Sequence, residues 1–391
     1  MMKKLLKGDG IYSFAASLIA ILLGVLVGAV VLFVANPAQA LNGLKSLFIG
    51  GFVDMKNVGQ TLYYATPIIM TGLSVGFANK CGLFNIGGSG QFIVGAYAAV
   101  LVGVKCTFLP TGLHCAAALL AAVLAGALWG LLPGVLKALC NVNEVISCIM
   151  MNYIGMSMVN LLVRKTVFDQ LKNQSKMPAA SAILPKMGFD KIFVAGKATS
   201  SANAGIIIAI VAGIIMWVVL SKTKFGYELK ACGYNRDAAK YAGINEKRSI
   251  IMSMVIAGAL AGLGGALMYL AGAGKGIHVV DTLAAEGFTG IPVALLGMSN
   301  PIGIIFAGLF MAHLTMGGFN MQIYGFVPQV IDIITSVIIY FSAFALFFQL
   351  VLRKKFNKGA DDNANAEKAL SAEAQALPEV LPENQGKGGE I

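Results

Sequence analysis

Charged residues are scarce in this chain. Asp, Glu, Lys and Arg make up 12% of the 391 residues, against about 25% in soluble globular domains. Apolar residues reach 57%, and the mean hydropathy is +0.78. The length alone would allow two or three soluble domains, but this composition excludes them.

Signatures of catalysis and metal binding are missing as well. The three histidines lie far apart in the sequence, which argues against a zinc site. Residues 273–276 imitate a phosphate-binding loop, but Tyr269 stands where that motif needs its first glycine and Gly276 where it needs Ser or Thr. No nucleophile has an evident neighbouring base. The sequence therefore predicts neither an enzyme nor a resident cofactor or metal.

The cysteines and the net charge exclude fewer classes of protein. The six cysteines form no CxxC pair and lie mostly in or beside apolar runs, as small packing residues do. Cys106 and Cys115 share one predicted outer loop, where an oxidising exterior would allow them to pair. The net charge is +11. The charged residues flank apolar runs, so they indicate membrane topology and contact with anionic lipid rather than nucleic-acid binding.

What the sequence does contain is long apolar runs. Residues 11–35 and 329–352 each hold the roughly 20 apolar residues that a membrane-crossing helix needs. The runs are continuous rather than alternating, which excludes a β-barrel. We predict an all-α, polytopic transmembrane helical bundle of ten crossings, with eight or nine as the alternatives. The predicted crossings are residues 11–35, 58–77, 91–104, 113–136, 145–163, 204–220, 249–271, 283–298, 301–318 and 329–352.

Lysines and arginines flank the first and last crossings, and positive flanks stay in the cytoplasm. Both ends are therefore predicted to be cytoplasmic. Residues 1–10 form the N-terminal segment and residues 11–352 the membrane domain. Residues 353–391 are predicted to be a disordered tail that is rich in acidic residues.

An even number of crossings assigns the two long polar loops to opposite sides. Residues 221–248 fall in the cytoplasm and residues 164–202 outside. The outer loop is as basic as the inner one, which the charge rule leaves unexplained, although it governs long loops only weakly.

Several predicted spans are short or broken. Residues 91–104 would measure roughly 21 Å as a helix, too little to cross alone. They follow a glycine- and amide-rich stretch, and unwound backbone at membrane depth often marks a transport path. Close helix packing is indicated by the GxxxG pairs Gly24/Gly28, Gly126/Gly130 and Gly258/Gly262.

Polar residues near the membrane are few, and such residues are functional candidates. Glu286 and Asp332 lie towards the outer ends of late spans. The residues predicted to border the substrate path are Asn85, Gln91, Glu144 and Asn152. The alternative is that these four only cap helices or bridge two of them.

The loop 221–248 contains a short predicted helix. Asn235 is a suitable N-cap and Gly243 a suitable stop, so residues 236–242 can form about two turns. Ala238, Tyr241 and Ala242 fall on one side at helical spacing, and Ala239 keeps a neighbouring face narrow. Such a helix is well shaped to be gripped by another protein; the alternative is a capped turn in a solvated loop.

Four stretches together carry a family resemblance over roughly residues 55–350. They resemble the permease subunits of ABC importers in the branched-chain amino acid and simple-sugar group, above all those of bacterial nucleoside importers. The stretches are GLFNIGGSGQ (82–91), NEVISCIMMNY (143–153), GYNRDAAKYAGI (233–244) and GFTGIPVALLGMSNP (287–301).

The resemblance implies a type II ABC importer in the bacterial cytoplasmic membrane. Two paralogous permeases would pair there above separate ATPase subunits, which hydrolyse the ATP. An extracytoplasmic solute-binding protein would deliver a small uncharged cargo, a nucleoside. Residues 235–244 would be the coupling helix that docks into the ATPase. The residues assigned to this coupling are Gly233, Asn235, Arg236, Asp237, Ala238, Ala239, Tyr241, Gly243 and Ile244.

Other hypotheses remain open at this stage. The same machine could import simple sugars or branched-chain amino acids. An ion-coupled secondary carrier, a channel and a membrane scaffold belong to different classes. No chain of carboxylates and histidines that would carry protons is evident, which weakens the ion-coupled hypothesis.

Overall fold

The computed structural model describes residues 9–344, 347–348 and 350–351. Ser17–Ala345 form one compact unit. The second unit, Met1–Ala16 with Leu346–Ile391, consists largely of residues outside that description. Residues 1–8 and the whole predicted tail, 353–391, are among them.

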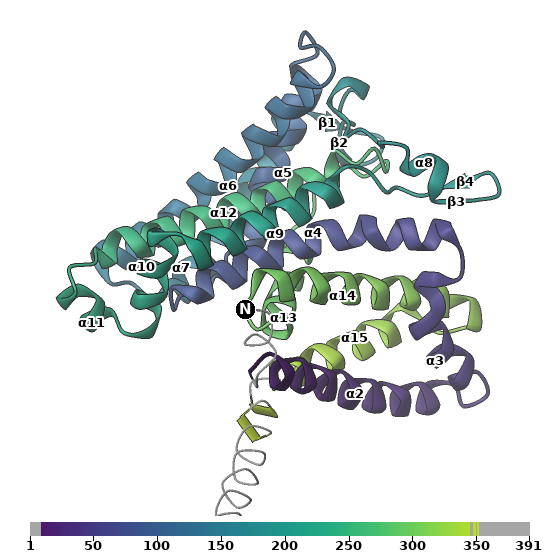
Figure 1. Ribbon diagram of the computed structural model, residues 1–391. Helices are drawn as coiled ribbons and strands as arrows, with labels where there is room; N and C mark the ends of the chain where they lie inside the picture. Colours follow the sequence, from purple (N-terminus) through teal and green to yellow (C-terminus); the bar gives the residue numbers. More distant parts are fainter. Residues whose placement is uncertain (1–8, 345–346, 349, 352–391) are drawn as a thin grey trace, which may run out of the picture. The chain divides into compact units, whose positions relative to one another are not determined.

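Helices make up most of the described chain (Figure 1). The long helices are α2 (Asp9–Ala35), α4 (Met55–Lys80), α5 (Gly88–Lys105), α6 (Leu113–Cys140), α7 (Glu144–Thr166), α9 (Gly205–Lys222), α12 (Glu246–Tyr269), α14 (Pro301–Met321) and α15 (Pro328–Ala343). The shorter helices are α3 (Ala40–Ile49), η1 (Gly50–Phe52), η2 (Ala180–Ala182), α8 (Phe189–Ile192), α10 (Lys224–Tyr234), α11 (Arg236–Tyr241), α13 (Glu286–Leu296) and η3 (Gln322–Tyr324). Two antiparallel hairpins, β1 (Phe168–Asp169) with β2 (Gln174–Ser175) and β3 (Val194–Ala195) with β4 (Ala198–Thr199), are the strands of this part.

The predicted all-α, polytopic class is confirmed. Each of the ten predicted crossings overlaps one helix: α2, α4, α5, α6, α7, α9, α12, α13, α14 or α15. Within the described residues, 7 helices are long and apolar enough to cross a membrane, and α4, α13 and α15 are not among them. α13 has only 11 residues. The number of crossings therefore stays a prediction.

Two expectations about the third span and its loop need correction. The prediction that residues 91–104 are too short to cross was wrong, because α5 begins at Gly88 and has 18 residues. Glycines in its first turn allow close contact with neighbouring backbone: a Cβ at Gly88 would lie 2.8 Å from the Gly287 carbonyl oxygen. Cys106 and Cys115 are both free thiols and do not pair.

One end of the bundle collects the turns near α10 and α11 (Figure 1); we call it the α11 end. The end of α4 is tied to the turn between α13 and α14, because the Asn79 amide donates to the Ser299 hydroxyl at 3.3 Å. The turn between α6 and α7 is closed by an ion pair of 2.8 Å between Lys137 and Glu144. Successive helices thus return to this end alternately, as an antiparallel bundle requires.

The two hairpins lie at the opposite end, where residues 270–285 connect α12 to α13 (Figure 1). We call this connection the strap. Backbone bonds tie it to β2: Ser175 N–H donates to the Ile277 carbonyl at 2.8 Å, and Val279 N–H to that of Asn173 at 3.1 Å. The loop 164–202, predicted as a polar loop, is therefore a folded cover that holds the strap.

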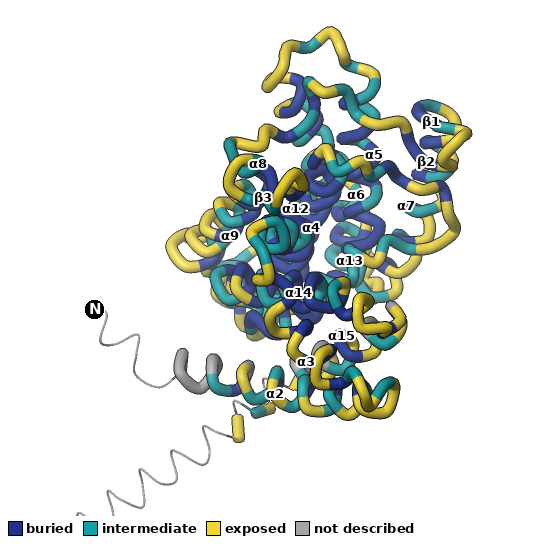
Figure 2. Tube along the Cα trace, turned by 90° about the vertical axis from the view of Figure 1, so that its right-hand side faces the viewer, coloured by how far each residue is buried: buried dark blue, intermediate teal, exposed yellow. Residues whose placement is uncertain are grey.

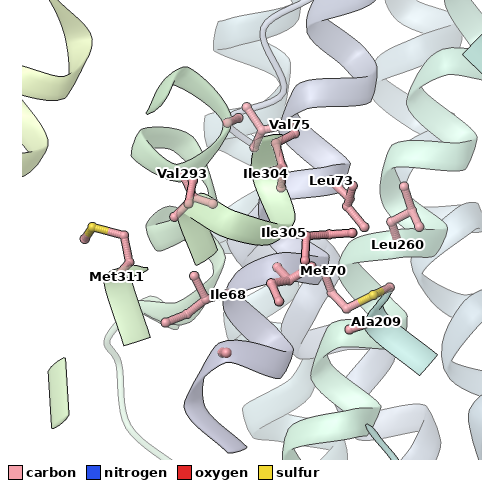
Figure 3. Packing of buried hydrophobic residues seen from close by; sticks show 14 of the residues in the cluster. Ile68, Met70, Leu73, Val75, Ala209, Leu260, Val293, Ile304, Ile305 and Met311 are labelled. Atoms are coloured by element: carbon pink, nitrogen blue, oxygen red, sulfur yellow. The ribbon is translucent and has the colours of Figure 1, made fainter. Parts of the chain in front are cut away.

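Apolar side chains from several helices meet around α4 (Figure 3). Met70 and Leu73 of α4 are 0% and 1% exposed. Val293 of α13 and Ile304 of α14 are completely buried in the same cluster. Figure 2 shows buried segments gathered along α4 and α12, while β4 and many residues of α2 are exposed. The core thus fixes α13 and α14 against α4.

Glycines set the spacing between α6 and α12. The predicted GxxxG pairs of these two helices face each other: a Cβ at Gly258 would overlap the carbonyl oxygen of Gly126 and lie 3.1 Å from the Cα of Gly130. On its other side α12 meets α5 in the same way, because a Cβ at Gly95 would overlap Gly262. We call these contacts the glycine seam. Backbones that approach this closely gain dispersion contacts, which drive helix association in lipid.

Candidate functional site

The helix α11 has the capping that its sequence predicts. The Asn235 side chain accepts a hydrogen bond of 3.0 Å from the Ala238 N–H. At the other end Gly243 has φ +78°, a left-handed conformation that favours glycine. The Ile244 N–H returns to the Ala239 carbonyl at 3.0 Å. Both predicted boundary residues are confirmed, and the helix ends at Tyr241 rather than Ala242.

The faces of α11 differ from the expectation at one residue. Tyr241 is 95% exposed, and Ala238 and Ala242 are exposed beside it. Ala239 is only 4% exposed and belongs to the core. It anchors α11 to the bundle instead of narrowing an exposed face. Of the other residues assigned to coupling, Asp237 is exposed, whereas Arg236 and Ile244 are half-buried.

A groove of about 510 Å³ lies between α10 and α11. Tyr227, Ala231 and Tyr234 line it from α10, with Ala238 of α11 and Ala242 just beyond it. Tyr234 is 91% exposed. The small alanines leave room between the two tyrosines for side chains of another protein. Aromatic residues such as these tyrosines supply much of the binding energy of protein interfaces.

The loop that carries the groove touches the membrane part through two glycines. A Cβ at Gly233 would overlap the carbonyl oxygen of Lys80, and one at Gly82 would lie 3.2 Å from the carbonyl oxygen of Gly233. Residues 81–87 are the unwound stretch between α4 and α5. We call it the break. The backbone of the loop therefore rests directly on the backbone of the break.

Two of the predicted path residues, Asn85 and Gln91, stabilise the break through hydrogen bonds. Asn85 is 0% and Gln91 1% exposed, and their amides bond each other at 2.9 and 3.2 Å. Asn85 also donates to the Ser74 hydroxyl at 3.1 Å and accepts from the Gly87 N–H at 3.1 Å. Their polar groups are thus used within the protein, as buried amides require.

A cavity of about 300 Å³ lies beyond the break, between α5, α7, the strap and the start of α13. Asn152, another predicted path residue, lines it. The Asn152 side chain accepts from the Gly90 N–H at 2.8 Å and donates to the Ile86 carbonyl at 3.0 Å. It therefore joins the cavity wall to the break.

The fourth predicted path residue lies elsewhere. Glu144 forms its ion pair with Lys137 at the α11 end, where the side chains of the two residues are 15% and 14% exposed. It does not line the cavity that Asn152 lines. The structure thus brings Asn85, Gln91 and Asn152 together and leaves Glu144 apart.

The strap closes one side of the cavity. Its residue Val280 accepts from the Asn160 amide at 2.9 Å, and the same amide reaches the Asp281 carboxylate at 3.2 Å. Ala284 accepts from the Ser89 hydroxyl at 2.9 Å. The strap is thus attached to both α7 and α5, the two helices that form the opposite cavity wall.

Comparison with known proteins decides the family. Residues 57–343 match the family described as "Branched-chain amino acid transport system / permease component". The chain belongs to this family. Its members are permease components, so this permease is a component of a transport system.

Curated relatives cover most of this permease. It is 40% identical to the guanosine ABC transporter permease protein NupP of Bacillus subtilis, over 88% of this chain and 97% of the relative. It is 38% identical to the nucleoside ABC transporter permease protein NupB of Lactococcus lactis, over 86% of this chain and 92% of the relative. Identity to the glucose ABC transporter permease protein TsgB13 of Haloferax volcanii is 30%, over 86% and 89%. No solved structure matches this permease.

Sequence reasoning missed most of the residues around the cavity. Asn160, Tyr269, His278 and Thr282 line it, together with Ser89 and Glu286. Glu286 stood out in the sequence as a carboxylate near a span end, whereas the side chain of Asp332, noted with it, lies outside the description. The strap offered one further signal, because a connection of this length with several glycines between two apolar runs needs a reason.

The amide pair in the break gives a first prediction. Replacing Asn85 with Leu leaves Gln91 and the Gly87 N–H without partners, which costs about 1–3 kcal/mol for each buried group. Replacing Gln91 with Met leaves fewer buried groups without partners, because Asn85 keeps its bonds to the Ser74 hydroxyl and the Gly87 N–H. We therefore expect Asn85→Leu to lower the thermal midpoint more than Gln91→Met, and the double variant to lose less than the sum.

Thermal unfolding of the purified permease, with transport kinetics in parallel, checks this order. Asn42→Leu is the matched control, because Asn42 belongs to an exposed amide pair with Gln39 at 2.7 Å and should shift the free energy of unfolding by less than about 0.5 kcal/mol. If Gln91→Met changes the KM for cargo at an unchanged thermal midpoint, the amide pair contacts the solute and the stabilising role is wrong.

Proposed function

We propose that this permease is a subunit of an ATP-driven importer of nucleosides in the bacterial cytoplasmic membrane. The ATP is hydrolysed by a separate ABC ATPase, a second permease completes the membrane part, and an extracytoplasmic solute-binding protein delivers the cargo. The nucleoside cargo is supported by the two relatives whose names include guanosine or nucleoside, each covered over nine-tenths of its length.

The observation that carries the coupling is the shape of α11. It is capped at both ends, anchored by the buried Ala239, and presents Ala238 and Tyr241 beside a groove. A rigid helix that is fixed on one face and exposed on the other is suited to transmit force from a docked ATPase. This role assigns the α11 end to the cytoplasm and the hairpins to the outer side.

Backbone and side-chain contacts support a route from α11 to the cargo. Movement of the loop would press Gly233 against the break at Gly82. The break carries Asn85 and, through Asn152, one wall of the cavity. Displacement of a packed element between two discrete positions is the usual way in which such interfaces switch. The cavity would thus open to one side of the membrane at a time.

The folded cover at residues 164–202 then faces the solute-binding protein. Lys172, Lys176, Lys186, Lys191 and Lys197 are exposed on it. A positive outer face would steer a partner with acidic lobes onto the permease. This assignment gives the basic outer loop a role that the charge rule did not.

The test is uptake by cells that express the complete importer. Radiolabelled guanosine is added alone and with an excess of another nucleoside, a monosaccharide or a branched-chain amino acid. We expect competition by nucleosides only, and loss of uptake on ATP depletion but not on addition of an ionophore. Competition by glucose would favour the sugar alternative, which the relative from Haloferax volcanii supports. Collapse with the ionophore would instead favour an ion-coupled carrier.

A further inference from the structure

One carboxylate in the cavity has no partner among the described residues. Glu286 lies in the first turn of α13 and is the one side chain with a formal charge in the cavity lining. Among the described residues no hydrogen bond or ion pair reaches its carboxylate; the contact recorded for Glu286 is made by its backbone carbonyl, which accepts from Thr289 at 2.8 Å. Glu286 is half-buried, and ionisable residues within a membrane protein are functional candidates.

Two features lie close to the Glu286 carboxylate: the start of α13 and the strap residue Lys275. The start of a helix stabilises a negative charge. The strap residue Lys275 is near enough for the carboxylate to oppose the lowering of the Lys275 pKa by burial. Lys275 itself lies over the rings of Tyr63 and Tyr64, at 5.7 and 5.3 Å, and makes no ion pair with Glu286 within the described part. The Glu286 carboxylate therefore has its acceptor positions open among the described residues.

The rest of the lining limits what such a carboxylate can receive. Ser89, Asn152, Asn160 and Thr282 supply neutral polar groups, and Tyr269 supplies aromatic surface. A Ca²⁺ ion needs about 6–8 oxygen ligands, usually with several carboxylates, so one carboxylate does not suit it. A zwitterionic amino acid would need a cation for its own carboxylate, and no Lys or Arg lines the cavity.

We propose that Glu286 binds the cargo in this cavity by accepting two hydrogen bonds from a pair of adjacent donors on a neutral solute. This inference rests on the proposed nucleoside function. A nucleoside has such pairs in two places, the ribose 2′,3′-diol and the N–H edge of a purine base such as guanine. The volume of about 300 Å³ is at the lower end of the range for small-molecule sites, as a solute of this size requires.

The test compares Glu286→Gln with the unchanged permease in the complete importer. Initial uptake rates are measured over a range of concentrations for guanosine, 2′,3′-dideoxyguanosine and inosine, which lacks the exocyclic amine. We expect Glu286→Gln to lower kcat/KM for guanosine about tenfold or more, because hydrogen bonds to a charged acceptor are the strong ones. The matched control is Asp54→Asn, a carboxylate-to-amide change at the N-cap of α4, outside the cavity lining, where Asn caps a helix as well as Asp does.

The analogues distinguish the two donor pairs. If the diol is bound, the preference for guanosine over the dideoxy analogue disappears in Glu286→Gln. If the base edge is bound, the preference for guanosine over inosine disappears instead. Unchanged kinetics for all three solutes would overturn the inference while leaving the nucleoside function intact. Failure of the unchanged permease to import any nucleoside would overturn both.

A measurement on the unchanged protein covers the case in which Glu286→Gln does not reach the membrane. Dicyclohexylcarbodiimide modifies carboxyl groups in apolar surroundings, and mass spectrometry gives the modified fraction of the peptide that contains Glu286. Guanosine at saturating concentration is expected to slow this modification at least threefold, with no such effect of leucine. Equal modification with and without guanosine contradicts the proposed contact.

Discussion

Replacing Ala238 with Trp is expected to leave the permease in the membrane and to lower its uptake ten- to hundredfold. Ala238 is exposed on α11 and lines the groove beside α10, so the larger side chain meets no residue of the core. It would instead occupy the surface on which the ATPase is proposed to dock. Overpacking of a fitted surface costs about 1–3 kcal/mol, and each 1.4 kcal/mol weakens association about tenfold.

The control keeps the position and changes only the size. Ala238→Ser should retain nearly all uptake, because it adds one atom to an exposed site. Co-purification of the ATPase with a tagged permease measures docking directly, and immunoblotting of membranes measures abundance. Normal co-purification and uptake in Ala238→Trp would show that the ATPase binds elsewhere.

Ala239 provides a contrast between docking and folding. It is 4% exposed and packs in the core, so Ala239→Trp should reduce the amount of folded permease instead of uncoupling it. Adjacent alanines are thus expected to fail in different assays, and the sequence pattern alone does not separate them. The residues around the cavity depend even more on tertiary contacts.

The positions of the helices were predictable because hydropathy and capping are local properties. In lipid every backbone polar group must be bonded within the chain, so each apolar run of sufficient length becomes a helix. Asn235 and Gly243 bound α11 for an equally local reason, since a cap bonds the N–H three residues on and a stop needs a left-handed backbone.

The cavity could not be predicted in the same way. Its walls come from α5, α7, the strap and α13, which lie far apart in the sequence. Asn85 and Gln91 were assigned to the path because both flank the break, but they bond each other. The strap, rather than these two residues, closes the cavity, because it bonds to Asn160 and Ser89. No local sequence pattern encodes such contacts.

Replacing Gly258 with Leu is expected to remove nearly all folded permease from the membrane. The carbonyl oxygen of Gly126 occupies the position of a Cβ at Gly258, so any larger residue forces α6 and α12 apart. α12 also packs against α5 through Gly95 and Gly262, so it cannot shift away without breaking that contact. The glycine seam is rigid from both sides.

The smaller change Gly258→Ala adds only a Cβ at the same contact, so its effect on stability can be estimated. In an exposed helix this substitution would stabilise by roughly 1 kcal/mol, because alanine has the higher helix propensity. In the glycine seam we expect the opposite sign, a destabilisation of about 1–3 kcal/mol from overpacking. The thermal midpoint of the detergent-solubilised permease should fall accordingly, by roughly 2–4 °C per kcal/mol.

Combining Gly258→Ala with Gly126→Ala tests whether the two residues share one contact. Once the first alanine has separated the helices, the second should cost less than it does alone, so the double variant should lose less than the sum. Leu128→Ala on α6 is the control, because Leu128 is 64% exposed and touches no partner in the seam. An unchanged or raised midpoint in Gly258→Ala would mean that α6 and α12 are not held at this distance, and the cavity wall that α5 forms against α12 would lose its support.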